Sequence, residues 1–222
     1  MPQRTLEPSL QWPLTCLGAG ALALALASCS TTGVAVPNTA ASSSGQPSGQ
    51  LSIRQTDEAG RSLPFENQFP NRWNINNDGT TYEPCTAIEP STASQFGLIP
   101  ESLRDVAASD FQTARGCKWK FRNDGRSSLS QAVGNLMQPE EGLTGYKQQY
   151  AATMEWRSDV EVQGRRVIVG STMPSECTVF VASGAAVVGT GVTRFGAEKP
   201  SLDDTCESAM SFLRITIDDI PE

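Results

Sequence analysis

The side chains with the clearest chemical potential in this chain are its cysteines. There are six of them, and the sequence contains no histidine. A thiol can form a disulfide, bind a metal or accept a covalent group. The absence of histidine excludes Ser-His-Asp and Cys-His nucleophiles and every zinc site that needs an imidazole. An enzyme with this sequence would depend mainly on carboxylates, lysine or tyrosine.

One cysteine ends an apolar stretch near the start of the chain. Residues 21–30 read ALALALASCS, and no charge occurs from residue 12 to residue 27. Arg4 and Glu7 are the charged residues that precede it. A short start with a base, an apolar stretch and small residues at its end is typical of a secretory signal peptide. We predict that residues 1–28 are such a signal, with an uncleaved membrane anchor as the alternative.

The four residues that close this stretch predict a lipid anchor. Leu26-Ala27-Ser28-Cys29 matches the bacterial lipobox, which is an aliphatic residue, two small residues and cysteine. In such signals the thiol of the cysteine accepts a diacylglycerol, and cleavage leaves the acylated cysteine as the first residue. Acyl chains such as palmitate hold firmly, because each buried methylene contributes ~0.8 kcal/mol. We therefore expect Cys29 to attach the protein to the extracytoplasmic face of the cell membrane.

The remaining cysteines predict disulfides. Cys16 lies inside the signal, which leaves Cys85, Cys117, Cys177 and Cys206. An exported chain with four cysteines usually forms two disulfides, and we favour the sequential pairing, which staples each half of the domain locally. Zinc bound by all four thiolates is disfavoured, because the spacings are long and no Cys-x-x-Cys occurs. We expect neither a metal nor a cofactor.

The charge balance restricts the partners. Lysine and arginine total 17, aspartate and glutamate total 24, and the formal net charge is −7. The first 28 residues contain one base and one acid, so their removal leaves this charge unchanged. An acidic protein is a poor candidate for binding nucleic acid, because DNA and RNA need a basic surface. We expect no nucleic-acid partner.

The composition divides the rest of the chain into a tether and a domain. Residues 30–50 contain almost nothing but small residues, proline and glutamine, which cannot offset the entropy of ordering. Residues 51–71 are mixed, and such an arm either docks on the domain or stays loose. The predicted organisation is a signal over 1–28, a lipidated cysteine with linker and arm over 29–71, and a folded domain over 72–222.

Apolar periodicity places the elements of that domain. Alternation predicts strands, and apolar residues at four-residue steps predict helices. We expect an α+β domain with a mostly antiparallel sheet and a few short helices packed on it. We expect three helices, over 89–98, over 146–156 and in the segment that follows Ser201. The expected strands cover 116–123, 127–137, 177–182 and 185–192, and residues 160–169 form two strands joined by a glycine turn.

The order of several short motifs resembles a family of actinobacterial lipoproteins called DUF3558. The resemblance implies an envelope lipoprotein with two disulfides and a small α+β domain, and the family has no assigned activity. By analogy alone, it also suggests a PsbP/Mog1-like sheet. The resemblance covers the chain from about Arg72 to its end, and its motifs are Pro84-Cys85-Thr86-Ala87-Ile88, Gly97-Leu98, Gly116-Cys117-Lys118-Trp119, Gly164-Arg165-Arg166-Val167, Ser175-Glu176-Cys177-Thr178-Val179 and Asp204-Thr205-Cys206.

Three residues are weak candidates for ligand contact. Trp119 alternates with Cys117 on its strand, which favours a core residue over a ligand wall. Trp156 is followed by an arginine and suits either a pocket mouth or packing at a helix end. Arg165 lies at a hairpin turn, where an anion contact competes with plain solvation. No catalytic motif is present.

These observations leave three hypotheses about function. The first is a non-catalytic binding module for an envelope lipid, glycan or protein. The second is a hydrolase that uses carboxylates, which requires two acids at catalytic separation in a pocket, one with a raised pKa. The third is a structural or accessory subunit of an envelope complex, which an exposed apolar patch without a cavity would indicate.

Overall fold

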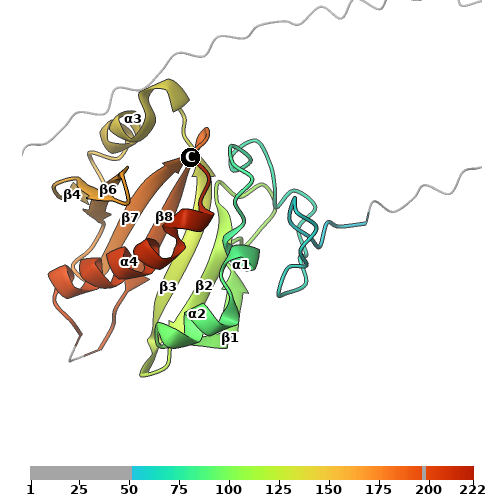
Figure 1. The fold of residues 1–222 in the computed structure, drawn as a ribbon, viewed down its shortest axis with the longest axis horizontal. Helices are drawn as coiled ribbons and strands as arrows, with labels where there is room; N and C mark the ends of the chain where they lie inside the picture. The colour runs from blue at the N-terminus through green and yellow to red at the C-terminus, as the bar shows by residue number, and fades with distance from the viewer. Residues whose placement is uncertain (1–51, 197–198) are drawn as a thin grey trace, which may run out of the picture. The chain divides into compact units, whose positions relative to one another are not determined.

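The computed structural model describes residues 52–196 and 199–222. The predicted signal, Cys29 and the tether lie outside these residues. The described part of the chain folds around one sheet of eight strands, ordered β1-β2-β3-β8-β7-β6-β4 with β5 also paired to β6 (Figure 1). Every pairing is antiparallel, so the predicted α+β class with a mostly antiparallel sheet is confirmed.

The strands and helices follow one another in a simple order along the chain. The strands are β1 (Leu98–Asp105), β2 (Arg115–Phe121), β3 (Asp124–Asn135), β4 (Glu155–Trp156), β5 (Val160–Val162), β6 (Arg165–Ser171), β7 (Glu176–Ser183) and β8 (Ala186–Thr193). The helices are α1 (Pro84–Ala87), α2 (Pro90–Gln95), α3 (Gly142–Gln149) and α4 (Leu202–Thr216), with short 3-10 segments η1 (Pro139–Glu141) and η2 (Ile217–Asp219). None of the helices in this described part combines the length and apolar character that crossing a bilayer requires.

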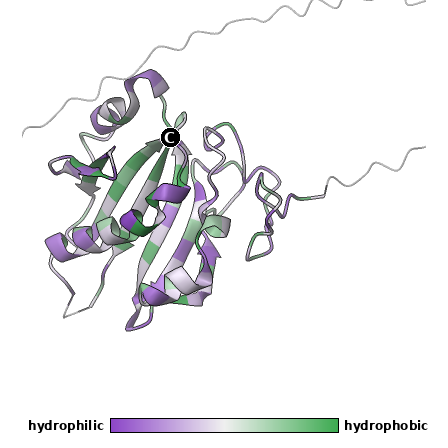
Figure 2. Ribbon diagram, in the orientation of Figure 1, coloured by the Kyte–Doolittle hydropathy of each residue, from purple (hydrophilic) through white to green (hydrophobic). Residues whose placement is uncertain are grey.

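The longest helix, α4, covers one face of the sheet. Its N-cap is Ser201, whose hydroxyl accepts a hydrogen bond from the amide of Asp204 at 3.1 Å, as the sequence predicts. The helix lies across β7 and β8, and apolar residues are concentrated on the strands behind it (Figures 1 and 2). Phe212 is fully buried and packs edge-on against Phe96 with ring centroids 5.0 Å apart. This face of the sheet therefore carries the larger apolar core of the domain.

Both disulfides of the sequential pairing are present. Cys177 joins Cys206 at an S–S distance of 2.08 Å and ties β7 to α4. Cys85 joins Cys117 at 2.04 Å and ties α1 to β2. Since all four sulfurs are paired, the zinc alternative has no thiolates to use.

The arm before residue 72 is part of the fold. Leu63 is buried in the core, and Asp57 is buried where it accepts a hydrogen bond from the hydroxyl of Thr86 at 2.6 Å. Arg54 stacks over Trp73 at 4.2 Å from the ring centroid. Of the two outcomes that the sequence left open for residues 51–71, docking is the one seen from residue 52 onward. The compact unit therefore begins before residue 72.

A buried ion cluster holds the segment that leads into the sheet. Arg72 is fully buried and donates to Glu83 and to Asp105, both at 2.7 Å. Arg115 contacts the same Glu83 at 3.1 Å and donates to the carbonyl of Tyr82 at 2.6 Å. Burial alone would lower the pKa of Arg72, but the hydrogen bonds and charges of Glu83 and Asp105 together outweigh it and the pKa is raised. Two cations thus share two carboxylates, which makes their burial tolerable.

Several elements differ from the sequence prediction, and neither the short helix α1 nor the strand β4 was expected. The strand β1 was not predicted, because Pro100 and several polar residues hide its pattern. It is an edge strand with an irregular register between Ile99 and Arg104, where a proline is tolerated. The helix predicted over 146–156 is wrong in its bounds, since α3 ends at Gln149 and the chain turns back into β4.

Candidate functional site

The alternation of residues along the central strands separates two unlike faces. Leu129, Gln131 and Val133 of β3 point toward α4, as Cys177, Val179 and Val181 of β7 and Val188, Thr190 and Val192 of β8 do. These assignments follow from the Cys177–Cys206 disulfide and from the hydrogen bond between Gln131 and Thr216, 3.0 Å long, because successive residues alternate in side. The residues between them face the opposite side, where α3 packs on β7.

The opposite face is built from small residues where β3 meets β8, and beside them Ile168, Phe180 and Val187 are buried in a second apolar cluster with Leu143 of α3. The register places Ser130 beside Gly191 and Gly191 beside Thr178, and the next row joins Ala132, Gly189 and Phe180. A Cβ at Gly191 would lie 2.9 Å from Thr178 Oγ1 and 3.4 Å from Ser130 Oγ. At Gly189 a Cβ would lie 3.1 Å from the ring of Phe180, so side chains of the neighbouring strands lean over both glycines and form much of the floor of a hollow.

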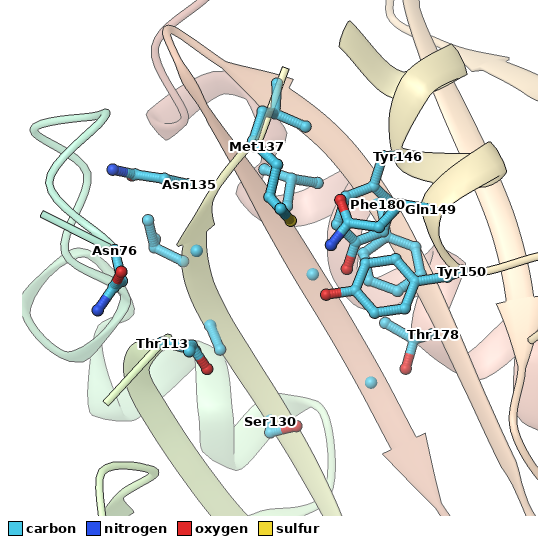
Figure 3. A pocket seen from close by; sticks show the side chains of 18 of the residues that line it. Asn76, Thr113, Ser130, Asn135, Met137, Tyr146, Gln149, Tyr150, Thr178 and Phe180 are labelled. Atoms are coloured by element: carbon cyan, nitrogen blue, oxygen red, sulfur yellow. The ribbon is translucent and has the colours of Figure 1, made fainter. Parts of the chain in front are cut away.

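This hollow is a groove of about 550 Å³ with the three central strands as its floor. Figure 3 shows the two walls, one from α3 with Gln149 and Tyr150 and the other from the loops that carry Asn76 and Thr113. Met137 stands at the rim with 77% of its surface exposed.

The α3 wall rests on an aromatic cluster. Tyr146 lies 4.7 Å from Tyr150 and 5.1 Å from Phe180, measured between ring centroids. The indole of Trp156 donates to the carbonyl of Lys147 at 3.1 Å and supports the same helix from behind. Burial raises the pKa of Tyr146, with the charge of Tyr150 as a smaller cause, so its hydroxyl stays protonated at neutral pH. Figure 3 shows the hydroxyl of Tyr150 directed into the space over the strands.

The opposite wall is held by amide side chains. Asn135 donates from its side chain to the carbonyl of Ile75 at 2.8 Å and from its backbone to that of Asn76 at 2.7 Å. The side chains of Asn74 and Asn77 both donate to the carbonyl of Gln112, at 3.0 and 3.1 Å. These bonds join the segment around residue 75 to the loop before β2, so the wall is fixed in advance of any ligand.

The groove carries hydrogen-bonding groups but no charge. None of the residues that line it is acidic or basic. In the described residues, the side chains of Ser130, Gln149 and Tyr150 make no hydrogen bond within the protein, although each reaches the groove. The site can therefore donate and accept hydrogen bonds to a ligand and offer a ring face, but it cannot neutralise a charged group.

The structure places the three candidates from the sequence away from the groove. Trp119 is 1% exposed and lies in the α4 core, 6.3 Å from the ring of Phe212. It also borders a separate hollow of about 380 Å³ between the arm and β1. Trp156 is a supporting residue behind α3 and does not line the groove.

Arg165 is occupied by backbone carbonyls. Its guanidinium donates to Ile217 at 3.2 Å and Ile220 at 2.6 Å, and also to Ala182 and Pro221. Burial lowers the pKa of Arg165. These bonds hold the end of the chain against the ends of β6 and β7, so both terminal nitrogens of the guanidinium are already used.

Sequence reasoning missed every residue that lines the groove. The available signal was the alternation in Ala185-Ala186-Val187-Val188-Gly189-Thr190-Gly191, where glycines share a parity. Two glycines at alternate positions in a strand mark a face with nothing packed on it, or a close approach. The residues of the walls come from separate segments, and no local pattern brings them together.

The acidic residues of the described chain lie outside the groove lining. Among the described carboxyl groups with a resolved shift, the pKa of each is lowered, mainly by hydrogen bonds: Asp57, Asp124, Asp159 and Glu207. In Asp57 burial is the largest single effect and acts upward, but the hydrogen bond from Thr86 and those from Arg61 outweigh it. Within residues 52–196 and 199–222 there is also no group of three or more acids and cysteines placed to hold a metal ion.

The fold and the groove define a disulfide-braced α+β domain with one covered and one open sheet face. Residues 24–218 match the model of a family described as "Protein of unknown function (DUF3558)". The chain belongs to this family. No curated protein and no solved structure matches the chain, so the PsbP/Mog1 analogy stays a prediction.

Proposed function

We propose that this protein is an extracytoplasmic binding protein, held to the membrane by a lipid on Cys29, whose ligand occupies the groove over β3, β8 and β7. The observation that carries the proposal is the groove itself: a preformed hollow with unpaired polar side chains and no charge. Ligand sites typically combine such a concave shape with a few placed polar groups.

The chemistry of the groove favours binding over catalysis. A carboxylate-dependent hydrolase needs two acids close to its substrate, and the lining contains neither aspartate nor glutamate. The shape also argues against a purely structural subunit, which would present a flat apolar patch. The family match begins at residue 24, so it spans Leu26-Ala27-Ser28-Cys29 and is consistent with an anchored form.

The groove is tested by filling it. The full chain is isolated from its native membranes in lipid nanodiscs, and bound molecules are identified by mass analysis. Ser130→Trp places a large ring on the floor of the groove, and Ile215→Trp places the same ring on the exposed side of α4. We expect a bound species with wild type and with Ile215→Trp, and at least a tenfold reduction with Ser130→Trp. Equal recovery from all three, or no bound species, contradicts the proposal.

The anchor is tested separately. Cys29→Ala removes the thiol that would accept the diacylglycerol, so the variant should carry no acyl chain and keep its unprocessed mass. Cys16→Ala is the control, because that cysteine lies inside the predicted signal. A Cys29→Ala protein that carries an acyl chain and migrates like wild type overturns the lipid anchor.

A further inference from the structure

The uncharged lining of the groove limits the chemical classes of ligand that it can bind. If it is the binding site proposed above, on which this inference rests, a charged ligand would enter it without a counter-charge. Burying an unpaired charge is costly, and every lining residue is uncharged. The chain as a whole carries a net charge of −7, which adds repulsion for an anion. The ligand must therefore be neutral where it contacts the protein.

A peptide strand fits this site poorly. Peptides bind sheets by adding a strand to a free edge, where unpaired backbone groups are available. Strands β3, β8 and β7 are each paired on both sides, so they present only a face. An extended peptide on this face would leave its own amides without backbone partners.

An acyl chain also fits poorly. Thr178 donates to Glu176, and the β8 backbone is paired on both sides. The groove nevertheless exposes the hydroxyls of Ser130 and Tyr150 and the amide of Gln149, which make no hydrogen bond within the described residues. Covering these groups with hydrocarbon would remove their water and return no hydrogen bond, which costs ~1–3 kcal/mol for each unpaired group. A lipid tail would be better served by a closed apolar cavity.

We propose that the groove binds an uncharged oligosaccharide. A sugar ring presents hydroxyls that donate and accept, together with an apolar C–H face. The amide of Gln149 offers both donors and an acceptor, and the Ser130 hydroxyl offers a third partner from the floor. Tyr150 is half-buried against Tyr146 and directs its ring and hydroxyl over the strands, where a sugar face can stack.

The glycines complete the fit. Because Gly189 and Gly191 carry no side chain, the ring of Phe180 and the side chains of Thr178 and Ser130 lie low over β8, which keeps the floor of the groove deep enough for a ring. The volume of about 550 Å³ and the open rim suit a few linked rings that extend beyond the protein. A chain of sugars can therefore enter from the side, and no lid is needed.

The test is a titration of the full chain in lipid nanodiscs prepared without alkyl glycosides, whose headgroups are themselves neutral sugars. The neutral probes are maltohexaose, cellohexaose and α-1,6-mannohexaose, and the charged probe is hexagalacturonate. We expect at least one neutral hexasaccharide to bind in the micromolar to millimolar range, and hexagalacturonate to bind at least tenfold more weakly. Gln149→Ala and Tyr150→Ala should each weaken binding ~tenfold, or ~1.4 kcal/mol.

The matched control is Gln148→Ala, which changes a neighbouring exposed glutamine of α3 that does not line the groove. It should alter affinity less than twofold. Gln149 is exposed, so its loss leaves folding intact even if Tyr150→Ala loosens the helix. The inference is overturned if none of the three neutral probes binds, if hexagalacturonate binds best, or if Gln149→Ala behaves like Gln148→Ala.

The membrane-derived ligand separates this inference from the proposed function. A neutral hexose-containing mass that Ser130→Trp removes supports both. A lipid, peptide or charged glycan that Ser130→Trp removes overturns the oligosaccharide and leaves the groove as the binding site. A bound species that Ser130→Trp does not affect overturns both.

Discussion

The two faces of the central sheet are made by the same strands and have opposite character. Toward α4, β8 presents Val188, Thr190 and Val192, and a helix and a disulfide close over them. Toward the groove, the residues between them include Gly189 and Gly191, and the space above stays open. One strand thus contributes to both the packed core and the floor of the groove. Alternate residues of the strand face opposite sides, and this decides to which of the two each residue belongs.

The difference shows how a small domain can remain stable with part of one sheet face uncovered. On that face Ile168 and Phe180 are buried in a cluster with Leu143 of α3, and small side chains on the open part beside them leave little apolar area for water to contact. Stability is concentrated on the other face, in α4, the buried ion cluster and two disulfides. The groove face is then free to be shaped for a ligand.

The largest effect should follow from a truncation in the α4 core. Phe212→Ala removes a fully buried ring that contacts Phe96 and Trp119, and we expect a loss of ~3–5 kcal/mol in the free energy of unfolding. Met137→Ala at the groove rim, which is 77% exposed, should change it by less than ~0.5 kcal/mol. Urea denaturation measures both. A similar loss in the two variants would remove the contrast between the faces.

The disulfide that closes the α4 face should give the next largest effect. Replacing Cys177 and Cys206 together with serine leaves no free thiol and opens a loop with a sequence separation of 29. The expected loss is ~3 kcal/mol, because the unfolded chain gains conformational freedom. Urea denaturation measures the loss, and peptide mapping without reduction should recover Cys85–Cys117 and Cys177–Cys206 in the wild type. Unchanged stability would show that the α4 packing alone closes this face.

Adjacent residues of β3 test most directly whether neighbouring side chains face opposite sides of the sheet. Gln131 is fully buried on the α4 side, accepts from the hydroxyl of Tyr82 at 2.6 Å and donates to Thr190 at 2.9 Å. Gln131→Leu strands the Tyr82 hydroxyl, so we expect a loss of ~1–3 kcal/mol in the free energy of unfolding. Ser130→Ala, one residue earlier on the groove side, should cost less than ~0.5 kcal/mol. Thermal denaturation of both variants decides, and equal costs would contradict the assignment of faces.

Much of the fold follows from the sequence because its signals are local. The alternation of Cys117, Trp119 and Phe121 predicts β2, and Ser201 marks the start of α4. Gly164 predicts the turn of the 160–169 hairpin in the same way. In the structure Gln163 and Gly164 adopt φ values of 50° and 79°, which a two-residue hairpin turn requires. The edge strand β1 was missed because a strand paired on one side only needs little apolar pattern.

The groove was not predictable from the sequence, and its physical nature explains why. Floor and walls join β3, β7, β8, α3 and two loops, which meet only in the folded chain. The conspicuous aromatic and basic residues, Trp119 and Arg165, are used in packing and in holding the C-terminal end. A site made of amides, hydroxyls and glycines gives no motif, because each of these residues is also common in loops and turns.

The smallest effect concerns the ion pairs that hold the α3 wall to the sheet. Asp159 accepts from Lys147 of α3 and from Arg166 of β6, both at 2.7 Å. The hydrogen bond from Lys147, followed by that from Arg166, lowers the pKa of Asp159, while the unfolded chain keeps the ordinary value. The stabilisation is therefore complete above the ordinary pKa and is lost as the pH falls through the lowered one. Asp159→Asn should cost about 1 kcal/mol or less at neutral pH, and its difference from wild type should shrink as the pH falls below the ordinary carboxyl pKa. Chemical denaturation across this range gives the difference, with Glu140→Gln as an exposed control on η1.

Amide hydrogen exchange should show that the opening caused by Asp159→Asn is confined to α3, because the pairs join only that helix to the sheet. If the cost of Asp159→Asn stays constant with pH, Asp159 stabilises this wall by packing and not by charge.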